Sequence, residues 1–207
     1  MNKFLEFIVR AEHKLYVTSK RLCLKNKTMT VFSSNCNGAY MLHDLGCPFY
    51  SPTVNLSFLP EHFLKFVSDP QKYLSAEMRE IQISDIDYPV GQIEDIRLYL
   101  MHYASFAEAK AAWERRARRV NMDNVFLVMT DKDGCTYDQI KQFDALPYEH
   151  KVIFTHKEYP EFSSAYYIPG FEGDGEVGIL SDWKPQLLRR RWLDDFDYVR
   201  FFNQQKN

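Results

Sequence analysis

The residue with the clearest chemical potential is Cys36, which lies where an apolar run over residues 29–32 gives way to polar residues. A segment able to form a helix, residues 39–45, follows. This pattern predicts a strand, a tight turn and the start of a helix. A thiol at such a turn lies near unpaired backbone N–H groups and the positive end of the helix dipole, and both favour the thiolate. The same geometry would also bind a phosphate or a carboxylate.

Two further polar segments directly follow predicted strands. His102 ends one apolar strand, and Asp131 and Asp133 follow another. Ligands bind beyond the carboxyl ends of the strands in an open parallel sheet. If these strands are neighbours, a thiol, an imidazole and a carboxylate meet there, as an activated nucleophile requires. We therefore predict that Cys36 is a nucleophile, that His102 accepts its proton and that Asp131 or Asp133 orients the imidazole.

Substrate contacts are predicted close to the same turn. The backbone N–H groups of Asn37 and Gly38, with the side chain of Asn35, could stabilise an oxyanion. Arg115 and Arg116 belong to a basic helix face that could hold a phosphate or an acidic sugar. The alternative for this basic face is a solvated helix surface.

Each of these residues also has a structural interpretation. A lone cysteine is usually a small buried hydrophobe, so Cys36 could simply pack in the core. His102 could hydrogen-bond the next loop, and Asp131 and Asp133 could cap the helix that follows them. His43 lies seven residues beyond Cys36, about two helical turns on, and we expect no direct contact between the two.

Composition limits the class of protein. The chain has 207 residues, of which 45% are hydrophobic and 15% aromatic, enough for one sizeable core or one large domain with a small appendage. The net charge of −2 argues against nucleic acid as a partner. No apolar run approaches ~18 residues, and the start of the chain is a poor signal peptide. The four cysteines are widely spaced, without a metal or cofactor motif, so we predict a cytoplasmic protein with no disulfide, metal or cofactor.

The strand–helix–strand rhythm over residues 96–156 predicts a largely parallel sheet. The expected fold is a single three-layer-like α/β domain over residues 28–207, preceded by an amphipathic helical segment over residues 1–27. That segment would pack on the domain or, alternatively, lie on an anionic membrane. Local signals predict further strands at 54–58, 81–83, 125–129, 151–156 and 165–168, and helices at 60–67, 69–76, 105–120, 136–146 and 194–203.

Several strings in the chain resemble a bacterial family of unknown function that is linked to exopolysaccharide biosynthesis. They run in order over nearly the whole chain and include residues 34–38, 51–54 (with Ser51 and Thr53), 88–91, 102–103, 113–116, 131–135 and 196–199. The family more often has Trp-Gly-Gly after its cysteine, whereas this chain has Asn37-Gly38-Ala39, which alters the pocket wall. The cysteine after a first strand and the later Arg-Arg pair are also similar to papain-like cysteine peptidases.

The resemblance implies an α/β fold, a cytoplasmic bacterial protein and a role in capsule or surface-glycan assembly, with Ser51 and Thr53 among the substrate contacts. The expected partner is a glycan or an activated sugar. Three functions stay open. They are a thiol-dependent hydrolase or transferase, a glycosyltransferase that uses a nucleotide sugar without covalent catalysis, and a non-catalytic glycan-assembly partner at a membrane surface. The sequence does not indicate an oligomeric state.

Overall fold

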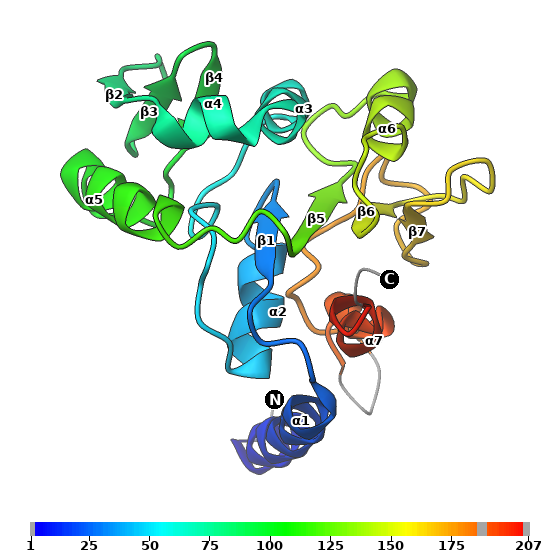
Figure 1. Ribbon diagram of the computed structural model, residues 1–207. Coiled ribbons are helices and arrows are strands. Elements are labelled where there is room, and N and C mark those ends of the chain that lie inside the picture. Colours follow the sequence, from blue (N-terminus) through cyan, green and yellow to red (C-terminus); the bar gives the residue numbers. More distant parts are fainter. Residues whose placement is uncertain (1–2, 186–189, 205–207) are drawn as a thin grey trace.

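A four-stranded parallel sheet forms the centre of the protein in the computed structural model, which describes residues 3–185 and 190–204 (Figure 1). Its strand order is β1-β5-β6-β7, and every neighbouring pair is parallel. All six residues of β5 are buried, as expected for a strand covered on both faces. The strands are β1 (Thr30–Ser33), β5 (Val125–Thr130), β6 (Lys151–Thr155) and β7 (Ala165–Tyr167).

A second, antiparallel sheet lies apart from the first and contains β2 (Met78–Ile81), β3 (Val90–Ile93) and β4 (Ile96–Tyr99). The prediction that the strand ending near His102 belongs to the parallel sheet is therefore wrong. Two residues separate β3 from β4, and so short a connection joins antiparallel strands. Burial along β4 alternates instead of being continuous, as in a sheet with one covered face.

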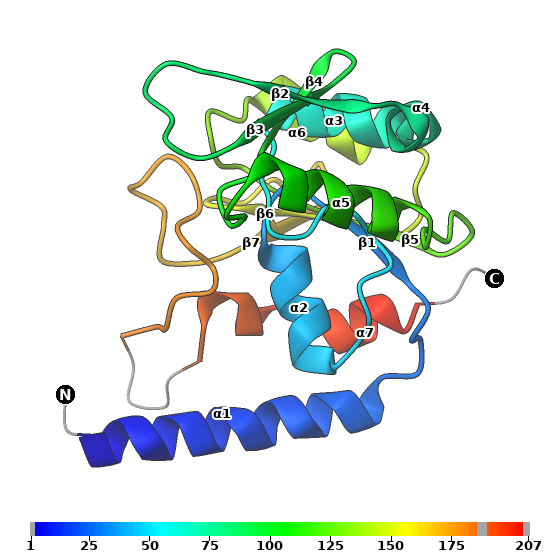
Figure 2. The ribbon, with the colours of Figure 1, turned by 90° about the vertical axis from the view of Figure 1, so that its left-hand side faces the viewer.

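Helices cover both faces of the parallel sheet, which confirms the layered α/β architecture (Figure 2). One apolar core joins β1 and β5 to α3, α5, α6 and the small sheet, and the other joins them to α2 and α7. The helices are α1 (Lys3–Cys23), α2 (Asn37–Leu45), α3 (Pro60–Ser68), α4 (Pro70–Ser75), α5 (Phe106–Ala117), α6 (Tyr137–Asp144) and α7 (Tyr198–Phe202). A 3-10 turn at Trp192–Asp195 and α7 replace the single closing helix expected at 194–203.

The helix α1 packs on the domain through a polar and aromatic face. Tyr16 Oη donates to the backbone oxygen of Asp194, and Arg21 donates to backbone oxygens of α2. Leu15 and Leu22 point outward and are 73% and 84% exposed. No helix in the described residues is both long enough and apolar enough to span a membrane.

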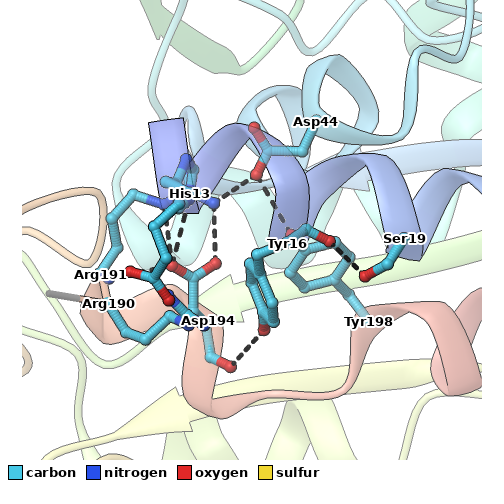
Figure 3. Close-up of polar contacts among 9 residues, drawn as sticks. His13, Tyr16, Ser19, Asp44, Arg190, Arg191, Asp194 and Tyr198 are labelled. Carbon is cyan, nitrogen blue, oxygen red and sulfur yellow. Dashed lines mark hydrogen bonds and ion pairs between the residues drawn. The ribbon is translucent and has the colours of Figure 1, made fainter. Parts of the chain in front are cut away.

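A buried ionic network fastens α2 to the C-terminal segment (Figure 3). Arg191 pairs with Asp44 on α2 and with Asp194, 2.9 Å away, and Tyr198 Oη donates to Asp44 at 3.2 Å. Burial lowers the pKa of Arg191, but its hydrogen bonds to the two carboxylates outweigh this, so its pKa is raised. The network holds the C-terminal end of the helix whose other end carries Cys36.

Candidate functional site

The turn at Cys36 has the predicted form, with β1 before it and α2 directly after it. Cys36 occupies the N-cap position, and its side chain makes no capping hydrogen bond. The amide of Gly38 donates to Ser33 Oγ at 3.1 Å, and the amide of Asn37 donates to Asn35 Oδ1 at 3.1 Å. These two N–H groups are thus already hydrogen-bonded within the turn, which corrects their expected role as free oxyanion donors.

A pocket of about 440 Å³ opens beside the cysteine, and its lining includes Cys36, Tyr40, His43, Phe49, Asn55 and His102. His43 and Tyr40 follow Cys36 at helical spacings of seven and four, so α2 presents them on the same side as the cysteine. His43 therefore shares the pocket with Cys36, and within the described residues no hydrogen bond joins the two side chains, as expected. The helical spacing of seven residues from Cys36 was the signal that could have identified His43 as a pocket residue.

The segment over residues 51–58 brings His102 to the pocket although β4 belongs to the other sheet. The amide of Phe58 donates to the backbone oxygen of Ser34 at 2.8 Å, next to the end of β1. Ser57 and Tyr99 exchange two backbone hydrogen bonds of 2.9 Å, which attach the same segment to the end of β4. An isolated bridge thus replaces the strand expected at 54–58, and it joins the two strand ends that carry Cys36 and His102.

Burial raises the pKa of the Cys36 thiol, while backbone hydrogen bonds from Asn55 and Leu56 lower it in part. This overturns the expectation that the turn alone favours the thiolate, because desolvation disfavours the charged sulfur more than the backbone stabilises it. A reaction at Cys36 therefore needs a proton acceptor in the pocket. His43 and His102 are imidazoles in that position.

Asp131 contacts a histidine that the sequence analysis overlooked. Its Oδ2 lies 2.6 Å from Nδ1 of His156, and within the described residues it makes no hydrogen bond to His102. Asp131 follows β5 and His156 follows β6, so the two neighbouring strands place them together. His156 directly follows an apolar strand. The same signal identified His102, so it could also have identified His156.

Asp133 lies in the loop after β5 and helps to close it. Its backbone amide donates to Glu176 Oε2 at 2.8 Å, and its φ of 59° places it in the left-handed region. Burial and the charge of Glu176 raise the pKa of Asp133. Within the described residues, no group of three or more His, Cys, Asp or Glu side chains is arranged to hold a metal ion.

Ser51 and Thr53 are buried, 0% and 1% exposed, and face the sheet instead of the pocket. Thr53 Oγ1 accepts a hydrogen bond from the Ser33 amide at 2.9 Å and donates to the backbone oxygen of Val31 at 3.3 Å. Ser51 Oγ lies 2.9 Å from Thr53 Oγ1. These hydroxyls support β1, which corrects their expected role as substrate contacts.

Arg115 and Arg116 differ in their surroundings. Arg115 is exposed, whereas Arg116 is half-buried with its guanidinium 5.7 Å from the ring of Phe49, a residue of the pocket wall. Arg116 Nη1 donates to Tyr103 Oη at 2.7 Å. Arg116 is the one of the two that lies close to the site.

Two other hollows among the described residues lack this combination of groups. A hollow of about 590 Å³ between α1 and α7 contains Cys23, and one of about 650 Å³ lies along residues 80–89 and 104–107, but neither is lined by a histidine. All four cysteines are free thiols, and burial raises the pKa of Cys135 to about 12. The Cys36 pocket is therefore the candidate site.

The fold and the pocket define an α/β protein with a cysteine and two histidines around one cavity. The chain belongs to the family described as Domain of unknown function (DUF1919), whose model matches residues 8–203. It is 46% identical over 183 residues to an uncharacterized protein of Haemophilus influenzae, a match that covers 87% of this chain and 86% of that protein. The family thus extends over nearly the whole chain, and function has to be argued from the pocket.

Proposed function

We propose that the protein is a thiol-dependent hydrolase or transferase that acts in bacterial surface-glycan assembly, in the cytoplasm. The observation that carries this proposal is the pocket shared by Cys36, His43 and His102. Cys36 Sγ would attack an electrophilic carbon of the substrate while His102 accepts the thiol proton, and the bond from that carbon to its leaving group would break as His102 returns the proton to the leaving group. Water, or the hydroxyl of an acceptor, would then displace the product from the sulfur and restore the thiol. The link to surface glycans comes from the resemblance in the sequence alone.

The two histidines divide the work in this proposal. His102 is the base in this proposal, because it reaches the pocket from the segment after β4 and not from the helix that carries the thiol. His43 lies on α2 with Cys36 and would donate a hydrogen bond to the substrate. Glutamine can donate a hydrogen bond but cannot accept a proton as an imidazole does. His102→Gln should therefore lower activity more than His43→Gln, in which a hydrogen-bond donor is kept.

The test uses a bacterium from which the gene has been deleted, together with analysis of its surface glycan. The wild-type gene and a Cys23→Ser control should restore the glycan, whereas Cys36→Ser should not. Cys23 is a matched control because it is an exposed thiol away from the pocket. Restoration by Cys36→Ser would overturn the nucleophile and favour a non-covalent glycosyltransferase.

A contact between α1 and an anionic membrane surface is a second proposal, favoured by one observation. Leu15 and Leu22 lie seven residues apart, on one face of the helix, and both side chains are exposed. The neighbouring Lys14 is also exposed and would attract an anionic surface. The Leu15→Glu/Leu22→Glu variant should lose co-sedimentation with vesicles that contain an anionic phospholipid. A Met122→Glu control, at an exposed methionine elsewhere, should bind as the wild type does. Equal binding by the leucine variant, or none by the wild type, would refute the contact.

A further inference from the structure

A chain of two hydrogen bonds runs from α5 to the wall of the Cys36 pocket. Arg116 Nη1 donates to Tyr103 Oη at 2.7 Å, and Tyr103 Oη donates to the backbone oxygen of Val54 at 2.8 Å. Tyr103 is 8% exposed, so both of its hydrogen bonds lie in a largely desolvated position. A donor that is itself bound to a cation is polarised, which strengthens the bond to the carbonyl.

The carbonyl of Val54 and the amide of Asn55 belong to the same peptide group. In a trans peptide, the C=O and the N–H point in opposite directions within one plane. Tyr103 therefore holds one end of this plane, while the other end carries the N–H of Asn55, a residue that lines the pocket together with Cys36. Rotation of the peptide would break the hydrogen bond from Tyr103 and turn this N–H at the same time.

The backbone at Asn55 also favours convergence of neighbouring N–H groups. Its φ of 61° lies in the left-handed region, which asparagine tolerates better than most residues. Successive N–H groups next to such a residue can turn toward one centre and form a concavity that binds an anion. Asn55 lines the same pocket as Cys36, and the backbone N–H groups of Asn55 and Leu56 lower the pKa of the Cys36 thiol.

We propose that Tyr103 and Arg116 are positioning residues that hold the Val54–Asn55 peptide so that the Asn55 and Leu56 amides stabilise the Cys36 thiolate when it forms. This inference rests on the proposed function for its biological meaning. Its physical content is the acidity of one thiol, which can be measured without knowing the substrate.

The experiment measures the rate of Cys36 alkylation by iodoacetamide across about pH 6 to pH 10, by mass spectrometry of the Cys36 peptide, in a Cys23→Ser background. Tyr103→Phe keeps the ring and removes the donor. Its alkylation profile should move to higher pH by about half to one unit, which is about three- to tenfold less thiolate at a given pH. Arg116→Gln, at a half-buried position, should move it in the same direction by less. Arg116→Lys should restore part of the difference.

Tyr40→Phe is the matched control, because Tyr40 lines the same pocket and its hydroxyl makes no hydrogen bond with the described residues. Its profile should equal that of the parent protein. The titratable groups that line the pocket, Tyr40, His43 and His102, are common to the parent and to the Tyr103 and Arg116 variants, so they do not explain a difference. Profiles of folded Tyr103→Phe and Arg116→Gln that match the parent would overturn the proposal.

The outcome is separable from that of the proposed function. A shifted profile together with full glycan restoration by Cys36→Ser would support the positioning role and refute the nucleophile. An unchanged profile in the Tyr103 and Arg116 variants, together with failed glycan restoration by Cys36→Ser, would refute the positioning role and support the nucleophile. If Tyr103→Phe does not fold, the Arg116→Gln profile decides alone, because loss of one half-buried guanidinium removes no core packing.

Discussion

Asp131 Oδ2 lies 2.6 Å from Nδ1 of His156 and 2.8 Å from the backbone nitrogen of the same residue. The other carboxylate oxygen accepts a hydrogen bond from the amide of Val177 at 2.8 Å. Asp131 is 3% exposed, so these contacts are desolvated. The carboxylate therefore fastens the end of β6 and the glycine-rich 171–178 loop to the end of β5.

Asp131→Asn should lower the free energy of unfolding by about 2–3 kcal/mol, because an amide directs N–H groups at donors that the carboxylate had satisfied. Urea denaturation measures this loss. Asp133→Asn is the control, since within the described residues the Asp133 side chain makes no hydrogen bond and the residue contributes its backbone amide to the loop, and it should change stability by less than about 0.5 kcal/mol. The pH profile of Cys36 alkylation should be the same in Asp131→Asn as in the wild type. A changed profile at unchanged stability would instead place Asp131 in the site.

Cys36 should react slowly with iodoacetamide at neutral pH, and its rate should rise as the pH is raised. The sign follows from the raised pKa, because a raised thiol pKa leaves less thiolate at neutral pH and moves deprotonation to more alkaline pH. Quantitative mass spectrometry of the four cysteine peptides would show Cys23, which is exposed, reacting before Cys36, and Cys135 last. A Cys36 rate that is already maximal at neutral pH would contradict the dominance of desolvation.

Gly38→Ala should destabilise the protein by about 1–3 kcal/mol through overpacking between α2 and β1. A Cβ at this position would lie 2.7 Å from Ser33 Cβ and 3.0 Å from Val31 Cγ1, and neither neighbour is the far end of a flexible chain. Thermal unfolding followed by circular dichroism would detect the loss. Gly173→Ala is the control, because a Cβ there meets nothing within 4 Å, and equal melting temperatures for the two variants would refute the steric explanation.

The network around Asp194 should make stability depend on acid pH. Burial raises the pKa of Asp194, but the contacts with His13 and Arg191 outweigh this and hold it below the usual range. A carboxyl whose pKa is lowered by folding stabilises the protein above its unfolded pKa, so stability should fall as the pH drops below about 4. Asp194→Asn should cost about 3–5 kcal/mol at neutral pH, because Arg191 loses a partner while buried.

Denaturation curves at several pH values test this dependence. Asp194→Asn should also show a weaker decline of stability toward acid than the wild type. Glu12→Gln, which breaks the partly exposed pair with Arg190, should cost less than about 1 kcal/mol. Parallel acid curves for the wild type and Asp194→Asn would mean that other carboxyls govern acid unfolding.

Local signals in the sequence were sufficient for the Cys36 turn and for most regular elements. The apolar run before Cys36 forms β1, and the helix follows directly after the turn. Ser105 accepts a hydrogen bond from the Glu108 amide at the start of α5, where the sequence predicts a helix to begin. These features depend on residues within about one helical turn or one strand of each other, so a linear pattern contains them.

The sequence by itself thus determined a layered α/β protein with a cysteine between a strand and a helix. Only the tertiary structure decided which groups surround that cysteine. In that structure β4 pairs with β3 and lies outside the parallel sheet, and Asp131 contacts His156. The side chains of Ser51 and Thr53 lie against β1. Such pairings join residues that are far apart in the chain. They depend on burying both apolar cores and on hydrogen-bonding the buried polar groups at the same time, and no local sequence pattern contains that information.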